Sequence, residues 1–183
     1  MTSDDYIKIF KESGALLEGH FVLTSGRHSS SYFQCAKVLQ YPKYLEMFSN
    51  EIASHFQKFE IDLVVSPAVG GFVIGTEVGR AMKKRTIFAE REDGKMRFRR
   101  GFNIKEKEKI LIVEDVITTG GSVKEVIQLI ENSGGVVEGV GVIVDRSSGS
   151  VTLHQNQLSL ASLEVKSSAA KRFSSISCGS KTP

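Results

Sequence analysis

The sequence has few of the features that mark disulfide-bonded or membrane proteins. It contains only two cysteines, Cys35 and Cys178, and three prolines in 183 residues. The cysteines are far apart and in no metal or redox spacing, which argues against a disulfide framework and fits a reducing cytosol. No apolar run approaches the length of a membrane span, and residues 1–10 lack the apolar core of a signal peptide. We therefore expect a cytoplasmic protein without a membrane partner.

The sequence also lacks a strong charge imbalance, internal repeats and a linker. The net charge of +3 is too mild to imply nucleic acid by itself. The composition, 40% hydrophobic and 25% charged, is that of an ordinary globular protein. Its length suffices for one α/β domain with a sizeable core, so we expect a single domain spanning residues 1–183.

Two common phosphate-binding motifs are absent. A Walker A loop has a lysine after its last glycine, but Ser122 stands at that point, and the dinucleotide fingerprint G-x-G-x-x-G does not occur. The most informative stretch instead reads ILIVEDVITTGGSVKE, from Ile110 to Glu125. It predicts a strand, two carboxylates, a polar glycine-rich turn and a helix.

The order of residues in this stretch favours an anion site. Residues 110–113 are apolar and mostly β-branched, as in a strand buried on both faces, and Glu114 and Asp115 follow where an open α/β sheet places its ligands. Ser122 is expected to be the N-cap of the next helix, with Glu125 completing a capping box. Free N–H groups at that helix start would bind a phosphate, and the carboxylates would suit hydroxyls or a metal ion. An ordinary strand–turn–helix would explain the glycines but not the paired acids.

A second strand–loop–helix unit lies in residues 61–75. Leu63 to Val65 predicts a buried strand, and the loop from Ser66 to Gly71 leads into a helix. Backbone amides would again be exposed at the helix start. The alternative is a plain glycine-rich connection, but two such loops in one small sheet favour binding.

Two further stretches carry positive charge. Residues 90–102 hold five basic residues: Arg91, Lys95, Arg97, Arg99 and Arg100. They could close over a polyanion, or form a solvated basic hairpin. A predicted strand, residues 136–144, ends in Asp145 and Arg146. Arg146 is either a clamp for a substrate carboxylate or a surface partner of Asp145 or Glu114.

The segment VEDVITTGGS, residues 113–122, resembles the 5-phosphoribosyl 1-diphosphate (PRPP) motif of type I phosphoribosyltransferases. With its flanking segments, the chain to about Val165 is similar to the orotate phosphoribosyltransferase family. The resemblance implies an α/β fold, a doubly wound parallel sheet with a small N-terminal hood over about residues 1–40. It implies transfer of phosphoribose from PRPP to orotate with Mg²⁺ as cofactor, and a homodimer with shared active sites. The tail from about residue 166 has no counterpart that could be aligned.

The resemblance also implies roles for individual residues. PRPP would be bound by Arg91, Lys95, Glu114, Asp115, Val116, Ile117, Thr118, Thr119, Gly120, Gly121, Ser122, Ala68, Gly70 and Gly71. Orotate would be bound by Thr118, Arg146, Tyr32 and Phe33, although the two aromatic residues fit core packing as well. Lys95 and Asp115 would be catalytic, and Mg²⁺ would be held mainly by PRPP, with Glu114 and Asp115 as candidate ligands. The loop at Ala68 would carry a cis peptide bond.

The chain departs from the family pattern at three points. Thr24 stands where an enteric branch has a lysine, with Arg27 the nearest substitute, and Gly70 stands where some relatives have a lysine. The histidine of the basic loop is missing. Two alternative functions therefore stay open: another PRPP-dependent nucleobase transferase, for a purine or uracil, and a non-catalytic PRPP-fold regulator that binds RNA.

Overall fold

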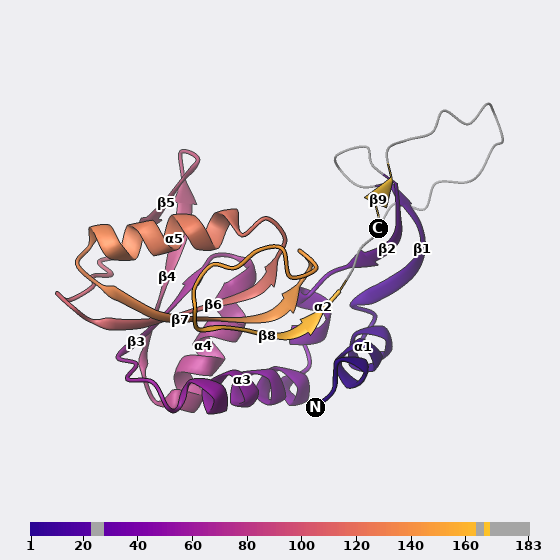
Figure 1. Cartoon of the computed structure of the whole chain (residues 1–183), viewed down its shortest axis with the longest axis horizontal. Coiled ribbons are helices and arrows are strands. Elements are labelled where there is room, and N and C mark those ends of the chain that lie inside the picture. Colours follow the sequence, from indigo (N-terminus) through magenta and orange to yellow (C-terminus); the bar gives the residue numbers. More distant parts are fainter. Residues whose placement is uncertain (23–27, 164–166, 169–183) are drawn as a thin grey trace.

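The computed structural model describes residues 1–22, 28–163 and 167–168 (Figure 1). The hood turn with Thr24 and Arg27, and most of the tail after residue 165, lie outside the described residues. The helices are α1 (Ser3–Glu12), α2 (Ala36–Leu39), α3 (Pro42–Phe56), α4 (Gly70–Met82) and α5 (Gly121–Asn132). The strands are β1 (Leu16–Val22), β2 (His28–Phe33), β3 (Leu63–Pro67), β4 (Arg85–Glu92), β5 (Lys95–Phe98), β6 (Lys109–Ile117), β7 (Val136–Asp145), β8 (Gln157–Ser162) and β9 (Ser167–Ser168).

The main sheet has six strands in the order β5-β4-β3-β6-β7-β8. Strands β3, β4, β6, β7 and β8 are parallel, and β5 runs antiparallel to β4 as the second arm of a hairpin. The expected strands at 63–65 and 110–113 lie side by side at the centre, with Val65 opposite Ile112. Both are fully buried there, as their continuous apolar runs predict.

Helices cover both faces of this sheet (Figure 1). Because side chains alternate along a strand, Val64 and Leu111 pack on one face with α3 and α4, whereas Leu63 and Ile112 pack on the other with α5. This arrangement is the doubly wound α/β fold expected from the sequence.

The N-terminal part forms the expected hood beside the main sheet. Strands β1, β2 and β9 make a small antiparallel sheet, and α1 packs beneath it. Phe10 of α1 lies edge-on to Phe33 of β2, with 5.1 Å between ring centroids, and also contacts Phe48 of α3. These aromatic contacts attach the hood to the core.

One local expectation was wrong. Ser122 is not an N-cap: α5 begins at Gly121, and its N-cap is Gly120, whose φ of 71° allows the chain to turn into the helix one residue earlier. The basic stretch forms a hairpin, one of the two alternatives considered, because β4 extends to Glu92 and pairs with β5. In the turn before β6, Glu108 is buried and accepts hydrogen bonds from Arg85 at 2.9 Å. In the described part of the chain, no helix combines the length and apolarity needed to cross a bilayer.

Candidate active site

Two adjacent carboxylates lie at the carboxyl end of β6, in the middle of the sheet. Glu114 is 6% exposed, and its carboxylate accepts the N–H of Asp115 at 3.0 Å. Burial and then repulsion by Asp115 raise the pKa of Glu114 to about 9. Burial also raises the pKa of Asp115. Two acids packed together at a strand end are costly for the fold, so the site favours a ligand that compensates them.

The turn after these acids leaves backbone N–H groups without side-chain partners. Thr118, Thr119 and Gly121 are exposed, and Gly120 in the left-handed conformation starts α5 with no side-chain cap. An uncapped helix start with aligned N–H groups attracts an anion. Ile117, just before the turn, is buried and accepts the N–H of Arg146 at 2.8 Å, while Val116 is partly buried.

The second loop meets the acids directly. The peptide bond between Ala68 and Val69 is cis, as the resemblance implies, and α4 starts at Gly70 without a side-chain cap. A Cβ on Gly70 would lie 2.6 Å from Asp115 Oδ1, and one on Gly71 would lie 2.8 Å from Glu114 Oε1. Because both glycines lack a Cβ, the start of α4 can approach the two carboxylates this closely without displacing them. The two loops and the two acids therefore form one continuous site.

Arg146 lies after β7 and is half-buried. Its Nε atom is buried and has no hydrogen-bond partner among the described residues, and burial lowers the pKa of its guanidinium. It makes no ion pair with Asp145 or Glu114. Asp145 instead accepts the N–H groups of Ser147 and Gly149 at 2.6 and 3.3 Å. An unpartnered buried donor is costly, which favours the clamp interpretation over surface pairing.

The hood aromatics have different surroundings. Phe33 is 7% exposed and packs in the core against Phe10. Tyr32, on the opposite side of β2, is half-buried, donates its hydroxyl to Gln34 at 2.7 Å, and lies close enough to act on the charge of Arg146. The structure therefore favours packing for Phe33 and leaves Tyr32 as the aromatic residue near the candidate orotate site.

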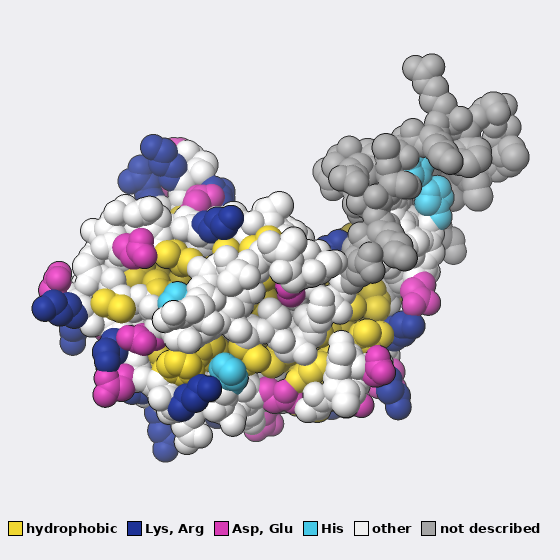
Figure 2. All heavy atoms as spheres, viewed as in Figure 1, with side chains coloured by type: hydrophobic (Ala, Val, Ile, Leu, Met, Phe, Trp, Pro, Cys, Tyr) yellow, Lys and Arg dark blue, Asp and Glu magenta, His cyan; other side chains and the backbone are white. Residues whose placement is uncertain are grey.

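The basic hairpin carries many charges, most of which are paired. Figure 2 shows Lys and Arg side chains gathered at its tip with Asp and Glu beside them. The arginines pair as Arg91 with Glu125, Arg100 with Glu90, and both Arg97 and Arg99 with Glu92. Lys95 is exposed and makes no ion pair within the described residues.

Sequence reasoning missed the supporting roles of Glu125 and Asp145. Glu125 reaches Arg91 across 34 residues, at 2.8 and 3.1 Å, and nothing local in the sequence signals that pair. Asp145 had a signal, because Asp followed two and four residues later by Ser147 and Gly149 is typical of a turn closed by the aspartate side chain.

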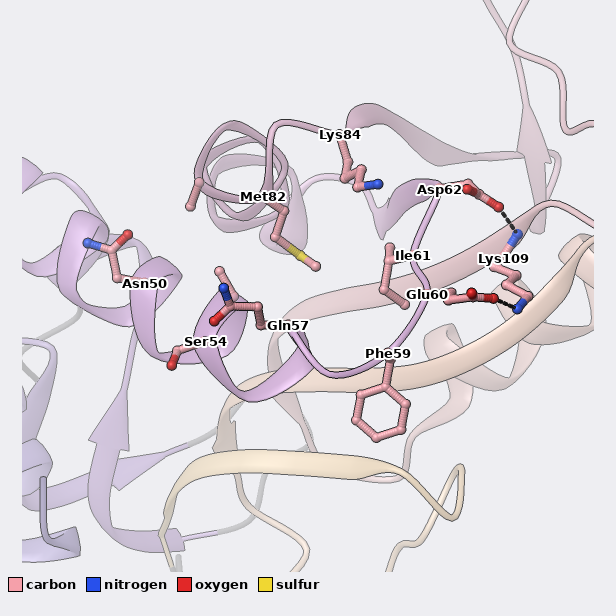
Figure 3. Close-up of a pocket in the computed structure, with 12 residues that line it drawn as sticks. Asn50, Ser54, Gln57, Phe59, Glu60, Ile61, Asp62, Met82, Lys84 and Lys109 are labelled. Atoms are coloured by element: carbon pink, nitrogen blue, oxygen red, sulfur yellow. Dashed lines mark hydrogen bonds and ion pairs between the residues drawn. The ribbon is translucent and has the colours of Figure 1, made fainter.

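An open cavity of about 710 Å³ lies elsewhere, between α3, α4 and the start of β6 (Figure 3). Three of its charged residues contact one another, as the Lys109 side chain contacts Glu60 and the Lys109 N–H binds Asp62 at 3.0 Å. It lies at the amino ends of the strands, whereas ligands of open α/β sheets bind at the carboxyl ends. None of the expected site residues lines it, so it is not the candidate active site.

Comparison with known proteins identifies the family. A family model described as the phosphoribosyl transferase domain matches residues 43–170. The orotate phosphoribosyltransferase of Chlorobium phaeobacteroides (strain BS1) is 60% identical over 91% of this chain and 86% of its own length. That of Caldicellulosiruptor bescii is 52% identical over 91% of this chain and 87% of its own. The solved orotate phosphoribosyltransferase of Aeropyrum pernix superposes with a TM-score of 0.68 at 25% identity, covering 85% of this chain and 92% of that one. The chain thus belongs to the orotate phosphoribosyltransferase family.

Proposed function

We propose that this protein transfers the phosphoribosyl group of PRPP to orotate in pyrimidine biosynthesis, giving orotidine 5′-monophosphate and diphosphate. The proposal treats residues 1–183 as one phosphoribosyltransferase domain. The observation that carries it is the meeting of two uncapped helix starts with the paired acids Glu114 and Asp115. PRPP offers a phosphate, ribose hydroxyls and a diphosphate in that order, and the three parts of the site match it.

Each part of the site has a distinct role toward PRPP. Backbone N–H groups of residues 118–122, at the positive end of α5, bind the 5′-phosphate. The carboxylates of Glu114 and Asp115 accept hydrogen bonds from the ribose hydroxyls. The start of α4, with Ala68, Gly70 and Gly71, presents N–H groups to the diphosphate.

The donor set also fits Mg²⁺, a hard cation that prefers oxygen ligands and keeps several of them from substrate or water. Glu114 and Asp115 provide carboxylate oxygens. Among residues 1–22, 28–163 and 167–168, no group of three or more His, Cys, Asp or Glu side chains could hold a metal ion. Glu114 and Asp115 would hold the ion together with oxygens of PRPP. When bound, Mg²⁺ neutralises charge on the leaving diphosphate.

The residues act mainly by positioning and electrostatics. Breaking the anomeric C–O bond gives the ribose oxocarbenium character, as in glycoside chemistry. Orotate attacks through an anionic nitrogen, so no strong general base is needed. Lys95, which is exposed and unpaired with the described residues, is available to stabilise the departing diphosphate, and Arg91 assists once it leaves Glu125.

Orotate differs from uracil by one carboxylate, and Arg146 is placed to recognise it. Its unpartnered Nε supports this role, and Thr118 and Tyr32 are proposed to contact the same ligand. Arg146→Ala should lower kcat/KM for orotate. The loss should correspond to about 2–5 kcal/mol of transition-state stabilisation, the range for truncating one partner of a buried charge pair. The KM for PRPP should change far less. No loss for either substrate would rule out the clamp.

The same proposal includes a homodimer with shared sites. Val69, Phe72 and Val73, at the start of α4, are 85%, 42% and 42% exposed. Phe72 continues into an aromatic row with Phe88 and Phe102 beneath the basic hairpin. Exposed apolar surface of this kind is commonly covered by a partner. If a second copy docked there, the basic hairpin of the first copy would lie close to the active site of the second.

Complementation tests the shared site. Mixing a Lys95→Ala chain with an Asp115→Asn chain should restore part of the activity, because a hybrid dimer has one site with both native residues. Dimers confirmed by sedimentation but without any recovery would argue that each chain uses its own hairpin.

The decisive assay measures diphosphate release from PRPP and Mg²⁺ with orotate, uracil, adenine or hypoxanthine as acceptor. Release only with orotate supports the proposal, and release with another base identifies a different transferase. An RNA-binding regulator should show steep salt dependence with RNA and no orotate-dependent release. Against that alternative, glutamates already pair with four arginines of the hairpin.

A further inference from the structure

Asp145 is a buried carboxylate that the proposed chemistry does not use. It ends β7 and is 5% exposed. Its two oxygens accept backbone N–H groups from the segment that follows, Ser147 at 2.6 Å and Gly149 at 3.3 Å. Its own carbonyl accepts the N–H of Leu163 at 2.9 Å. Both the main chain and the carboxylate of Asp145 are therefore committed to fixing this end of the sheet.

The residue between these contacts is Arg146. Its N–H is bound to the carbonyl of Ile117 at 2.8 Å, directly before the phosphate-binding turn. On its other side, the chain reverses through Ser148 and Gly149, whose φ angles of 56° and 76° lie in the left-handed region. The Asp145 carboxylate holds that reversal from inside. Arg146 is thus fixed on both sides while its Nε keeps no partner among the described residues.

We propose that Asp145 is a positioning residue for base recognition: its carboxylate fixes the turn that aims Arg146 at the acidic substrate. This inference rests on the proposed function. An arginine side chain loses considerable rotamer freedom when it binds, and a fixed backbone reduces that loss. Asp145 makes no ion pair with Arg146 and instead accepts the N–H groups of Ser147 and Gly149, so the guanidinium keeps its donors for the ligand.

Two substitutions test the inference. Asp145→Ala removes both acceptors, so the turn loosens and the orotate KM should rise about tenfold, as expected when hydrogen bonds of a charged group are lost. The PRPP KM should stay within about twofold, because the phosphate-binding turn keeps its own contacts. Asp145→Asn keeps one acceptor for the N–H of Ser147 and should give a smaller rise in the same direction.

Glu108→Ala is the matched control. Glu108 is also a buried carboxylate, 8% exposed, and it accepts a backbone N–H, that of Lys105 at 2.9 Å. It lies before β6, at the opposite edge of the sheet from Arg146. Its loss should lower the melting temperature without separating the two KM values. A purely structural role for Asp145 predicts the same behaviour for both alanine variants.

The outcomes separate the hypotheses. An equal rise in both KM values, or an orotate effect no larger than that of Glu108→Ala, would overturn the inference. Should Asp145→Ala fail to fold, the Asn variant and amide exchange in the native protein decide. Rapid exchange of the Ser147 and Gly149 N–H groups would show that the turn is not held and would also overturn it. If the native protein does not use orotate at all, the proposed function itself fails, which is a different result.

Discussion

Helix α1 and the two site helices begin in different ways. In α1, Thr2 Oγ1 accepts the N–H of Asp5 at 3.4 Å, and the Asp5 carboxylate accepts the N–H of Thr2 at 2.8 Å. The N-caps of α4 and α5 are Val69 and Gly120, and neither makes a side-chain cap bond. A capped start stabilises its own helix, whereas an uncapped start leaves N–H groups for an outside acceptor. The capped helix belongs to the hood scaffold, and α4 and α5 lie at the site. Helices α2 and α3 also start without a side-chain cap, so what distinguishes the starts of α4 and α5 is that both meet the paired acids.

The two uncapped starts differ from each other in charge. The strand before α4 ends in Ser66 and Pro67, which carry no charge, while the strand before α5 carries Glu114 and Asp115 in its last four residues. In chain order, β3 and α4 form the first unit, and β6 and α5 form the second. Glycines of the first unit lie against the acids of the second. One unit therefore offers only N–H donors, and the other adds carboxylate acceptors between them. This division matches a ligand with phosphates at both ends and hydroxyls in the middle.

Among changes to these two units, removing charge from the second should have the largest effect. Asp115→Asn keeps the shape of the side chain but removes a carboxylate from β6, so that the end of β6 becomes more like the uncharged end of β3. Losing a charged hydrogen bond costs about 1.5–3 kcal/mol, so kcat/KM for PRPP should fall roughly 10- to 100-fold. Stability should not fall, because burial already raises the pKa of Asp115 and disfavours its charged form.

Asp62→Asn provides the control for this change. Asp62 is exposed, accepts the N–H of Lys109 at 3.0 Å and lies at the opposite edge of the sheet. PRPP kinetics in that variant should match the native protein. If Asp115→Asn also keeps its PRPP kinetics within a few-fold, the acids do not bind ribose.

Glycine substitutions should separate the two units further. A Cβ on Gly71 would lie 2.8 Å from Glu114 Oε1 and 2.9 Å from the carbonyl of Val113, so Gly71→Ala should cost about 1–3 kcal/mol of stability and weaken PRPP binding. A Cβ on Gly121 would meet only Thr119 Oγ1, at 3.6 Å. Gly121→Ala should therefore leave the unfolding free energy unchanged and raise only the PRPP KM. Denaturant unfolding and initial rates measure both quantities. An unchanged PRPP KM in Gly121→Ala would mean that the phosphate does not approach this turn.

The central elements could be predicted because their sequence pattern is strong. Residues 63–65 and 110–113 are continuous apolar runs, and such runs are typical of central parallel strands. Parallel strands place their carboxyl ends at one edge, so Glu114, the loop at Gly70 and Arg146 were expected at a common edge. The sequence sufficed for these features because each depends on local composition and on one topological rule.

Other features depend on contacts between distant residues or on subtle backbone geometry. Strand β8, residues 157–162, is only half-buried and alternates with polar residues, so it has no distinctive apolar run. Ser122 and Glu125 fit a capping box, but the left-handed Gly120 starts the helix earlier and Glu125 binds Arg91 instead. Tyr32 and Phe33 could not be distinguished until the strand showed which of them faces the core.

The paired acids should also give the stability a specific pH dependence. The pKa of Glu114 is raised to about 9 in the folded protein, from an ordinary value of 4.5, by burial first and by Asp115 second. Between those values the folded state binds more protons than the unfolded state, so stability falls as pH rises. Glu114→Gln removes this contribution. Its unfolding free energy should therefore decline less than that of the native protein between pH 5 and pH 9, with the variant gaining at least about 1 kcal/mol relative to native across that range.

Urea unfolding at a series of pH values measures this difference directly. Comparing the two proteins cancels groups that titrate alike in both. Parallel curves for native and Glu114→Gln proteins would show that Glu114 is ionised in the fold at neutral pH. In that case Glu114 would carry a full negative charge at neutral pH, and the β6–α5 unit would differ more in charge from the β3–α4 unit than the raised pKa of Glu114 indicates.

The smallest effect is expected from Glu125, which ties the hairpin to the second unit. Its pair with Arg91 is partly exposed, with 42% and 43% of the two side chains accessible, and such pairs are screened by solvent and salt. Glu125→Gln should release Arg91 toward the diphosphate and lower the PRPP KM by less than about threefold. Glu131→Gln, an exposed position farther along α5, should change nothing. A higher PRPP KM in Glu125→Gln would instead mean that Glu125 holds Arg91 in its productive orientation. The basic hairpin would then be fixed to α5 in the free protein, before PRPP binds.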